Sequence, residues 1–485
     1  MAEPPPTETP SSDVPSGEIS RTSLPLPPGA WDPAARLVRS ALRPVESFLH
    51  IEASGGILLM IAAVIALGWA SSPWRLSYEH LLEAPVVLQV GAYELLTADL
   101  HFVINELLMT LFFFVVGLEI KREIRHGELS ELRRAALPIA AAIGGMVAPA
   151  LIYIAFNPSG PARSGWGVPM ATDIAFAVGV LTLLGRRVPP ALRVLLLTLA
   201  IVDDIGAVLV IAVFYSSGIA LGGFVLVAIG ILITMILQKT GVRAVWIYVI
   251  PGVIVWEGLH LAGVHPTLAG VLLGLLTPAH AWLGPERLIA IAGRSLTRIS
   301  ALVSSGRARP AELHDPLRDI QTARQEAISP VERLAAGLHP VVAWLIVPLF
   351  ALANAGVPLD SADLHGPAIP VMVGIVAGLV VGKPVGVLLG VGLVVLLRIS
   401  PLPKGVTWGG VAIVGMVAGI GFTMAIFVGD LAIAREMLDE AKLAILAASV
   451  IAGVATLVLG AIVLKPSELA GAARTESEAE SSTDA

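Results

Sequence analysis

The sequence predicts an all-α polytopic membrane protein with about twelve transmembrane helices. Of its 485 residues, 56% are hydrophobic and only 14% are charged, whereas soluble domains carry about 25% charged residues. The mean hydropathy is +0.84, and apolar segments recur that are long enough to cross a bilayer. The chain has no cysteine, so it can hold neither a disulfide nor a thiolate-bound metal.

Twelve apolar segments are candidates for membrane-spanning helices, which need about 20 residues each. In chain order they are residues 54–70, 102–120, 135–156, 168–184, 194–215, 219–237, 244–261, 266–276, 340–355, 370–397, 406–428 and 443–464. Together they predict a transmembrane domain over residues 46–465.

The two ends of the chain have the composition of disordered tails. Residues 1–45 are rich in proline and lack the basic and apolar regions of a secretory signal. Residues 466–485 are acidic and rich in serine and threonine. Both are therefore predicted to lie outside the folded domain.

Basic residues predict the orientation of the helices. If the N-terminus is cytoplasmic, the outer segments contain only Arg75, Arg163 and Arg435, with Lys442 at a boundary. The inner segments contain many more, and this positive-inside asymmetry predicts that both termini are cytoplasmic. Outside residues 279–339, which add eight arginines, the inner basic residues include Arg36, Arg39, Arg43, Lys121, Arg122, Arg125, Arg133, Arg134, Arg186, Arg187, Lys239, Arg243, Arg398, Lys404 and Lys465.

The outer segment between the first two spans predicts a small β-hairpin. Residues 85–97 (PVVLQVGAYELLT, Pro85 to Thr97) contain two β-prone runs separated by Gly91. An irregular loop is the alternative.

The inner segment of residues 279–339 is unusually long. Leu288, Ile291, Ala292, Leu296 and Ile299 recur near helical spacing with arginines between them. The segment is either an amphipathic element at the anionic inner membrane surface or a flexible cytoplasmic linker.

The fifth span contains two adjacent aspartates, Asp203 and Asp204, as its only charged groups. One carboxylate near the bilayer centre costs roughly 2.5–3.5 kcal/mol on insertion scales. Burial and mutual repulsion both favour the protonated form of a carboxyl group, so the pair is suited to bind a cation or to exchange protons. A static pair that is hydrogen-bonded to neighbouring helices is the structural alternative.

Two other spans contain signs of a broken helix. In the fourth, Pro169 and the pair Thr172–Asp173 interrupt an apolar run. In the eleventh, the sequence GIGFT from Gly419 to Thr423 does the same. Spans three to five and ten to twelve then form two inverted groups, each with a discontinuous middle helix, and such paired interruptions indicate a transport site.

Lys383 lies well inside the tenth span. Gly382, Pro384 and Gly386 surround it, which predicts a further break there. A buried ammonium needs an acidic partner. Because four ionisable groups at membrane depth are tolerable only together, Lys383 is predicted to share one polar site with Asp173, Asp203 and Asp204.

Four further residues are candidates for a response to pH. Glu119 and Glu123 share a helix face at the end of the second span, where the alternative is pairing with nearby basic residues. His265 and His339 each precede a proline at a helix start. Either histidine can change its charge near neutral pH, although lone histidines are more often structural.

In their order, the motifs of this chain resemble those of bacterial NhaA-type Na⁺/H⁺ antiporters, a family of inverted-repeat transporters. The resemblance covers about residues 54–464. It rests on FFFVVGLEIKRE at 112–123, ATDIAFAVG at 171–179, LAIVDDIGAV at 199–208, VHPTLAGV at 264–271, LHPVVAWLIVPLFALANAG at 338–356, GKPVG at 382–386 and GIGFTMAIF at 419–427.

This resemblance implies a role for each candidate residue. Asp203 and Asp204 would bind the ion and protons alternately, with Asp204 as the principal ligand. Asp173 and Thr172 would lie where the two broken helices cross, and Lys383 would balance the opposite helix ends and pair with Asp203. The positions tied to pH response are Glu119, Glu123, His265 and His339.

The resemblance also implies where the protein works and with what. It would be a multi-pass protein of the bacterial inner membrane, in contact with lipids, that forms a homodimer through the hairpin at residues 85–97. No cofactor or nucleic acid would be needed, since Na⁺ or Li⁺ and H⁺ are the transported ions. Ala335 and Ala336 depart from the family pattern, which has a Glu-His pair before the position of His339, and they leave the pH set-point open.

The predicted function is secondary antiport, not an enzymatic reaction. Protons and a small hard cation compete for the same carboxylate oxygens, and two carboxylates permit electrogenic exchange of more than one proton per cation. The alternative is a sodium-coupled organic-anion symporter of related architecture, which would need a basic residue or a large polar pocket near the breaks, whereas here acids outnumber the single lysine. A passive channel would need acidic rings or carbonyl filters, and a scaffold would not need four intramembrane charges.

Overall fold

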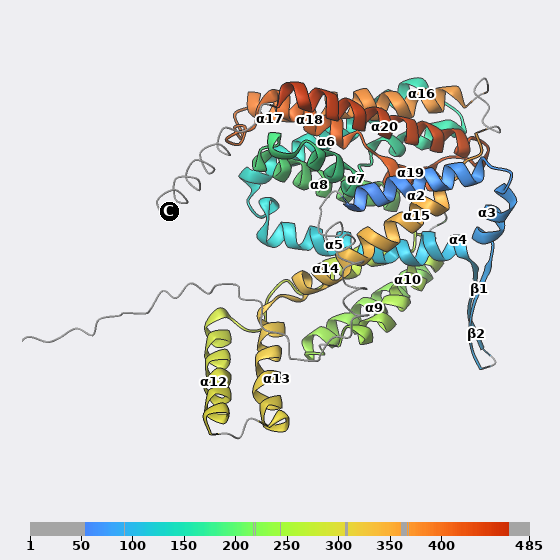
Figure 1. Cartoon of the computed structure of the whole chain (residues 1–485). Helices are drawn as coiled ribbons and strands as arrows, with labels where there is room; N and C mark the ends of the chain where they lie inside the picture. Colours follow the sequence, from blue (N-terminus) through green and yellow to red (C-terminus); the bar gives the residue numbers. More distant parts are fainter. Residues whose placement is uncertain are drawn as a thin grey trace, which may run out of the picture. The chain divides into compact units, whose positions relative to one another are not determined.

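The computed structural model describes residues 54–464, except for residues 92, 217, 219, 243, 306–308, 360–365 and 367. The predicted tails, residues 1–45 and 466–485, lie outside the described residues. The described part is a helical bundle with one two-stranded sheet (Figure 1), which confirms the predicted fold class.

Each of the twelve predicted spans coincides with a helix or with consecutive helical segments. In chain order these are α2 (Ser54–Ala70); α4, η1 and α5 (Leu100–Phe102, Val103–Leu108, Met109–His126); α6 (Leu132–Phe156); η3 and α7 (Pro161–Met170, Ile174–Leu183); α8 (Pro190–Phe214); α9 (Leu221–Lys239); η5 and α10 (Val245–Tyr248, Val249–Leu261); α11 (Leu268–Leu276); α14, η6 and α15 (Pro330–Val341, Val342–Ile346, Val347–Asn354); α16, η7 and α17 (Ile369–Ala377, Gly378–Gly382, Lys383–Leu396); α18 and α19 (Trp408–Ala418, Phe422–Ala432); and α20 (Leu438–Val463). A short helix, α3 (Arg75–Leu82), follows α2.

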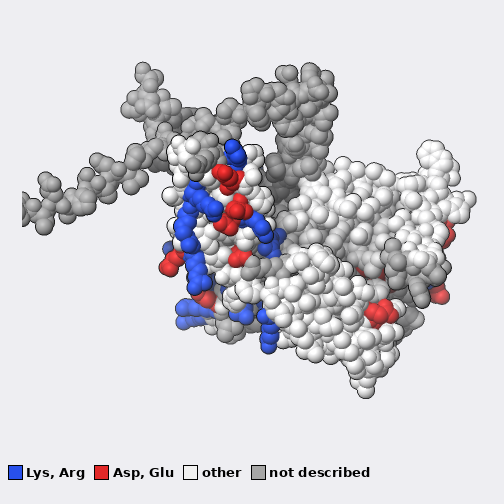
Figure 2. All heavy atoms as spheres, turned by 90° about the horizontal axis from the view of Figure 1, so that it is seen from below, with Lys and Arg blue, Asp and Glu red and all other residues white. Residues whose placement is uncertain are grey.

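Length and composition support a membrane protein with several spans. Among the described residues, seven helices are long and apolar enough to cross a membrane, and three bent pairs raise the number to at most ten. The two remaining predicted spans correspond to the shorter helix over Val245–Leu261 and to α11, which has nine residues. Many large apolar side chains on the bundle are exposed, and Figure 2 shows a broad uncharged surface, as hydrocarbon contact requires.

The predicted β-hairpin is confirmed. Strands β1 (Pro85–Val90) and β2 (Tyr93–Asp99) pair in antiparallel register, with Pro85 opposite Asp99 and an irregularity between Leu88 and Gln89. Gly91 has a φ of +64° in the turn, a conformation that glycine adopts without steric cost. The irregular-loop alternative is therefore wrong.

Residues 279–339 are largely helical. Helix α12 (Pro285–Ser304) and helix α13 (Pro310–Ala327) form a hairpin, and α14 begins at Pro330. The helical spacing in α12 was therefore informative, and a flexible linker is the wrong description of these helices. The ninth predicted span starts ten residues too late, because Ser329 accepts a hydrogen bond from the Glu332 amide and caps the helix upstream of Pro340.

Helix α17 packs against α6 with almost no space between the backbones. A Cβ on Gly144 or on Gly386 would collide with the carbonyl group of the other glycine, and a Cβ on Gly390 would collide with the Ala140 carbonyl. These glycines hold α17 against α6, and Lys383 lies one turn before Gly386. The close packing thereby fixes the position of Lys383.

The predicted break at Lys383 is wrong. Residues Ile369–Leu396 form one continuous 28-residue helix, in which Gly378–Gly382 form a π-helical turn before Pro384. Proline has no N–H to donate and disturbs the regular bonding pattern, and a single wider turn can absorb that disturbance. The helix therefore continues past Lys383 without an interruption.

Candidate functional site

Two broken helices cross at the centre of the candidate site. The chain bends by 45° between η3 and α7 and by 49° between α18 and α19. The first break contains Asp173 and the second contains Ile420, and the Asp173 amide donates a hydrogen bond to the Ile420 carbonyl at 2.8 Å. Both breaks were predicted from sequence, and the structure brings them together.

The Asp173 carboxylate accepts hydrogen bonds from the first turn of the helix that follows each break. Oδ1 of Asp173 accepts a hydrogen bond from the Phe176 amide at 3.0 Å, in the first turn of α7. Oδ2 accepts from the Thr423 amide at 3.2 Å and from the Thr423 hydroxyl, in the first turn of α19. Because helix N-termini carry partial positive charge and unpaired amides, a buried acid at this point satisfies both helices.

The C-terminal ends of η3 and α18, which lie before the two breaks, also have polar partners. The ammonium of Lys383 donates a hydrogen bond to the carbonyl of Met170, at the end of η3. The hydroxyl of Thr172 lies 2.8 Å from the carbonyl oxygen of Ala418, at the end of α18. A positive charge and a donor thus face the partial negative charge of the two C-terminal ends.

Asp203 is held by two of these residues. Its Oδ2 accepts a hydrogen bond from Lys383 at 2.7 Å and lies 2.8 Å from the Thr172 hydroxyl. Its Oδ1 is buried and has no partner among the described residues. The predicted ion pair between Lys383 and Asp203 is therefore present in the structure.

Asp204 has a different environment from its neighbour. It is only 2% exposed, and within the described part of the chain no hydrogen bond or ion pair reaches it. Its electrostatic interactions are repulsive with the carboxyl groups of Asp203, Glu119 and Asp173 and attractive with the ammonium of Lys383. Three carboxyl groups and one ammonium therefore act on Asp204, a balance that favours an added positive charge.

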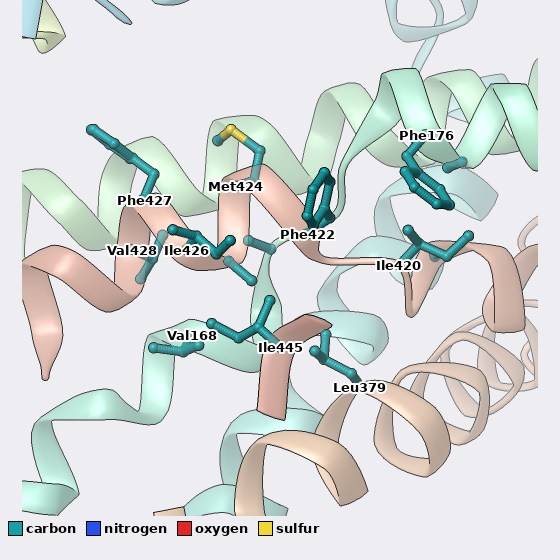
Figure 3. Packing of buried hydrophobic residues seen from close by; sticks show 14 of the residues in the cluster. Val168, Phe176, Leu379, Ile420, Phe422, Met424, Ile426, Phe427, Val428 and Ile445 are labelled. Atoms are coloured by element: carbon teal, nitrogen blue, oxygen red, sulfur yellow. The ribbon is translucent and has the colours of Figure 1, made fainter. Parts of the chain in front are cut away.

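Apolar side chains enclose the crossing. The rings of Phe176 and Phe422 meet edge to face with their centres 5.7 Å apart, and Leu379 and Ile420 are fully buried. Figure 3 shows these residues around the break between α18 and α19. Such surroundings lower the effective dielectric constant and strengthen every charge interaction at the site.

The candidate pH-response residues separate into two sets. Glu119 interacts electrostatically with Asp204 and also with His339 and Arg122, so His339 is connected to the aspartate site through Glu119. Glu123 instead accepts a hydrogen bond from the Glu128 amide at 2.8 Å. Its structural contact is thus local.

His265 lies beside α19, and its contacts among the described residues do not include Asp203 or Asp204. Its Nδ1 is 2.8 Å from the Thr267 hydroxyl, its Nε2 is 3.4 Å from Oε1 of Glu106, and its ring meets Phe427 edge to face. Oε2 of Glu106 is buried without a partner among the described residues. Sequence reasoning missed Glu106, although an acid within the second predicted span follows the same rule as Asp203.

A second pair was also missed. Asp430 of α19 and Lys442 of α20 form an ion pair at 2.9 Å, with side chains 19% and 11% exposed. Lys442 had been assigned to a boundary, and Asp430 lies two residues beyond the predicted end of the eleventh span. If the predicted eleventh span had extended past Asp430, Asp430 and Lys442 would have been placed at the same membrane depth.

Two crossed, broken helices beside a helix with a buried acidic pair define a secondary transporter built from discontinuous helices. The chain belongs to the Na⁺/H⁺ antiporter 1 family, whose model matches residues 46–460. It is accordingly a transporter and not an enzyme.

The relatives agree over almost the whole chain. The identity is 57% over 460 residues to the Na⁺/H⁺ antiporter NhaA 2 of Sorangium cellulosum, covering 94% of this chain and 98% of that protein. It is 52% over 474 residues to the Na⁺/H⁺ antiporter NhaA 2 of Myxococcus xanthus, covering 98% and 99%. It is 48% over 436 residues to the Na⁺/H⁺ antiporter NhaA of a Janthinobacterium species, covering 89% and 96%. These findings confirm the resemblance and give no support to a symporter.

Proposed function

We propose that this chain expels Na⁺ or Li⁺ from the cytoplasm in exchange for protons, by alternating access at Asp203 and Asp204. The observation that carries the proposal is the environment of Asp204. It is buried, it has no hydrogen-bond partner among the described residues, and Asp203, Glu119 and Asp173 are its acidic neighbours. A cation or a proton relieves the repulsion among these groups, and the one ammonium described at the crossing, that of Lys383, is already paired with Asp203.

The exchange follows from competition for carboxylate oxygens. Small hard cations prefer oxygen ligands, and a carboxylate must lose its proton to bind a metal ion. Oδ2 of Asp203 is already held by Lys383 and Thr172, whereas its Oδ1 has no partner among the described residues and can ligate a cation. Na⁺ and protons therefore occupy the pair in turn, and only the loaded forms would let the site change sides.

The crossing of the two broken helices holds the residues that would move when the site changes sides. Asp173 connects the starts of α7 and α19, and Thr172 lies between Ala418 and Asp203. A rearrangement of either broken helix therefore alters the hydrogen bonds around Asp203 directly. We assign Asp173, Thr172 and Lys383 to the positioning of the ion-binding pair.

We propose that Glu119 and His339 set the response to pH, with contributions from Glu123 and His265. Glu119 interacts with both Asp204 and His339, so a change of charge on α14 can reach the aspartate pair. Ala335 is buried in an apolar cluster with Leu118, a place that disfavours a charged residue. The pH set-point is therefore proposed to depend on Glu119 and His339 more than on residue 335.

The location and assembly of the protein are part of the proposal. Both termini would be cytoplasmic in the bacterial inner membrane, as the basic residues predict. A homodimer would form through the hairpin at residues 85–97, because a two-stranded sheet has two edges at which a second copy can pair. Membrane lipids would contact the exposed apolar side chains of the bundle.

Everted vesicles test the proposal. Addition of Na⁺ or Li⁺ should dissipate an imposed proton gradient, read with a pH-sensitive dye from about pH 6 to about pH 9, which brackets the ordinary histidine pKa of about 6.5. A membrane-potential dye then tests whether exchange is electrogenic. Uptake of an organic anion driven by Na⁺, without release of protons, would instead establish the symporter and overturn the proposal.

A further inference from the structure

The α12–α13 hairpin contains a cleft lined by arginines. The cleft has a volume of about 630 Å³ and lies between the two helices. Arg294 and Arg298 of α12 line it together with Arg318, Thr322 and the acids Asp319 and Glu326 of α13, so its charged side chains are three basic and two acidic. Figure 2 shows blue and red side chains gathered on this part of the molecule, beside a largely uncharged surface.

The three arginines have unused hydrogen-bonding capacity. Within the described part of the chain, none of them forms an ion pair, and the one hydrogen bond is from Nε of Arg294 to the Ala290 carbonyl of its own helix at 3.2 Å. A guanidinium group has five donors in a planar fork that fits a carboxylate in bidentate fashion. The cleft is therefore suited to a ligand with several carboxylates.

The cleft and the exposed apolar side of α12 face in opposite directions. Ile289, Leu296 and Val303 recur every seven residues and are 71%, 58% and 60% exposed. Arg294 is five residues from Ile289, or about 140° around the helix. If the apolar side contacts the bilayer, the cleft faces the aqueous phase, which favours a peptide over lipid headgroups.

We infer that the occupant of this cleft is the acidic C-terminal segment of the same chain. Residues 465–485 contain five acidic residues and two basic ones, and three of the acids, Glu476, Glu478 and Glu480, alternate along the sequence. Alternate side chains of an extended segment face one way about 7 Å apart. One helical turn separates Arg294 from Arg298 by about 6 Å, so the two spacings match.

The C-terminal segment, when extended, is longer than the helix that precedes it. The described chain ends at Leu464, and the fourteen residues from there to Glu478 span up to about 50 Å when extended. That exceeds the length of α20, whose 26 residues rise about 39 Å. The basic residues predict that this end and the α12–α13 hairpin lie on the same side of the membrane.

Thiol cross-linking in the full-length protein tests this contact, because the natural chain has no cysteine. The test pair is Thr322→Cys with Ser477→Cys, and the matched pair replaces Thr322→Cys by Ser300→Cys, on the apolar side of α12. In vesicles of phosphatidylethanolamine and phosphatidylglycerol, we expect the test pair to cross-link within one chain at least about fivefold faster. Salt at about 1 M should remove the difference.

Charge variants identify the surface that binds. The triple change Arg294→Gln, Arg298→Gln and Arg318→Gln should lower the rate of the test pair to that of the matched pair. A control triple with the same loss of charge outside the cleft, Arg287→Gln, Arg309→Gln and Arg324→Gln, should leave it unchanged. If the cleft triple fails to fold, the salt dependence of the unmodified cleft gives the answer.

Three results would overturn the inference. One is equal cross-linking of the two pairs. A second is cross-linking that persists in the folded cleft triple. The third is protection of a label at Thr322→Cys that requires phosphatidylglycerol and persists when Glu476, Glu478 and Glu480 are changed to Gln, which would identify lipid headgroups as the occupant.

Discussion

Lys383 donates a hydrogen bond to Oδ2 of Asp203 across 2.7 Å, and neither side chain has any exposed surface. Each charge makes the burial of the other tolerable. Asp204 follows Asp203 on the same helix, but no basic residue pairs with it in the described structure. The two adjacent aspartates therefore differ in environment: one is held in place, and the other is left to respond to an added cation or proton.

The first prediction concerns the Lys383–Asp203 pair. Lys383→Met should destabilise the protein by about 3–5 kcal/mol, because it leaves the Asp203 carboxylate buried without its partner. The double variant with Asp203→Asn should recover part of that loss, since the uncompensated charge is gone. Thermal unfolding in detergent, followed by tryptophan fluorescence, measures both. Equal stability of the single variant and the natural protein would contradict the importance of the pair.

Asp204→Asn should abolish Na⁺-dependent proton movement in everted vesicles without a loss of stability. No hydrogen bond among the described residues depends on this carboxylate, and its removal takes one negative charge away from three others. Asp439→Asn is a suitable control, because Asp439 is exposed at the start of α20. Full exchange by the Asp204 variant would refute the proposed ion site.

Asp173 provides a test of the crossing. Asp173→Ala removes the acceptor of the Phe176 and Thr423 amides, and each buried donor left unpaired costs about 1–3 kcal/mol. Asp173→Asn keeps an acceptor oxygen and should cost less. Asp99→Ala is the matched control, since Asp99 caps an exposed helix start through the Phe102 amide, and a lost cap there costs about 0.5–2 kcal/mol. Similar melting temperatures for the two alanine variants would contradict the bridging role of Asp173.

The sequence predicted those parts of the site whose residues lie within a single span. Asp203 and Asp204 stand out in an apolar segment, and the interruptions near Asp173 and Gly419 predict both breaks. The sequence predicted that Lys383 shares a site with Asp173 and Asp203, but it did not predict the contact of Thr423 with Asp173. That contact depends on how two distant helices cross.

The errors have equally specific causes. At Lys383, the glycines and Pro384 suggested a break, but their small size lets α17 pack tightly on α6, and a π-helical turn absorbs the proline. Within residues 279–339, a polar helix such as α13 has no long apolar run, so the search for membrane spans did not predict it. Glu106 was missed because the prediction for its span rested on the two acids at the end of that span, Glu119 and Glu123.

The packing of α6 on α17 makes a fourth prediction. Gly386→Ala should destabilise the protein by about 1–3 kcal/mol, because the added methyl group would meet the Gly144 carbonyl in a tightly packed interface. Gly392→Ala in the same helix is the control. It meets nothing within 4 Å and should be neutral or stabilising by up to about 1 kcal/mol. Equal melting temperatures for the two variants would show that the helices can separate to admit the methyl group.

The last prediction is the pH dependence of Na⁺ binding. Since protons and Na⁺ compete for the oxygens of Asp203 and Asp204, a lower pH should raise the Na⁺ concentration that gives half-maximal exchange. The rise should approach about tenfold per pH unit if one proton competes and about 100-fold if two compete. At saturating Na⁺ and high pH, exchange should slow because protons become scarce. Titrations in everted vesicles from about pH 6 to about pH 9 give this slope, with Asp439→Asn as the control. A half-maximal Na⁺ concentration that does not change with pH would mean that the two ions do not share the aspartate pair.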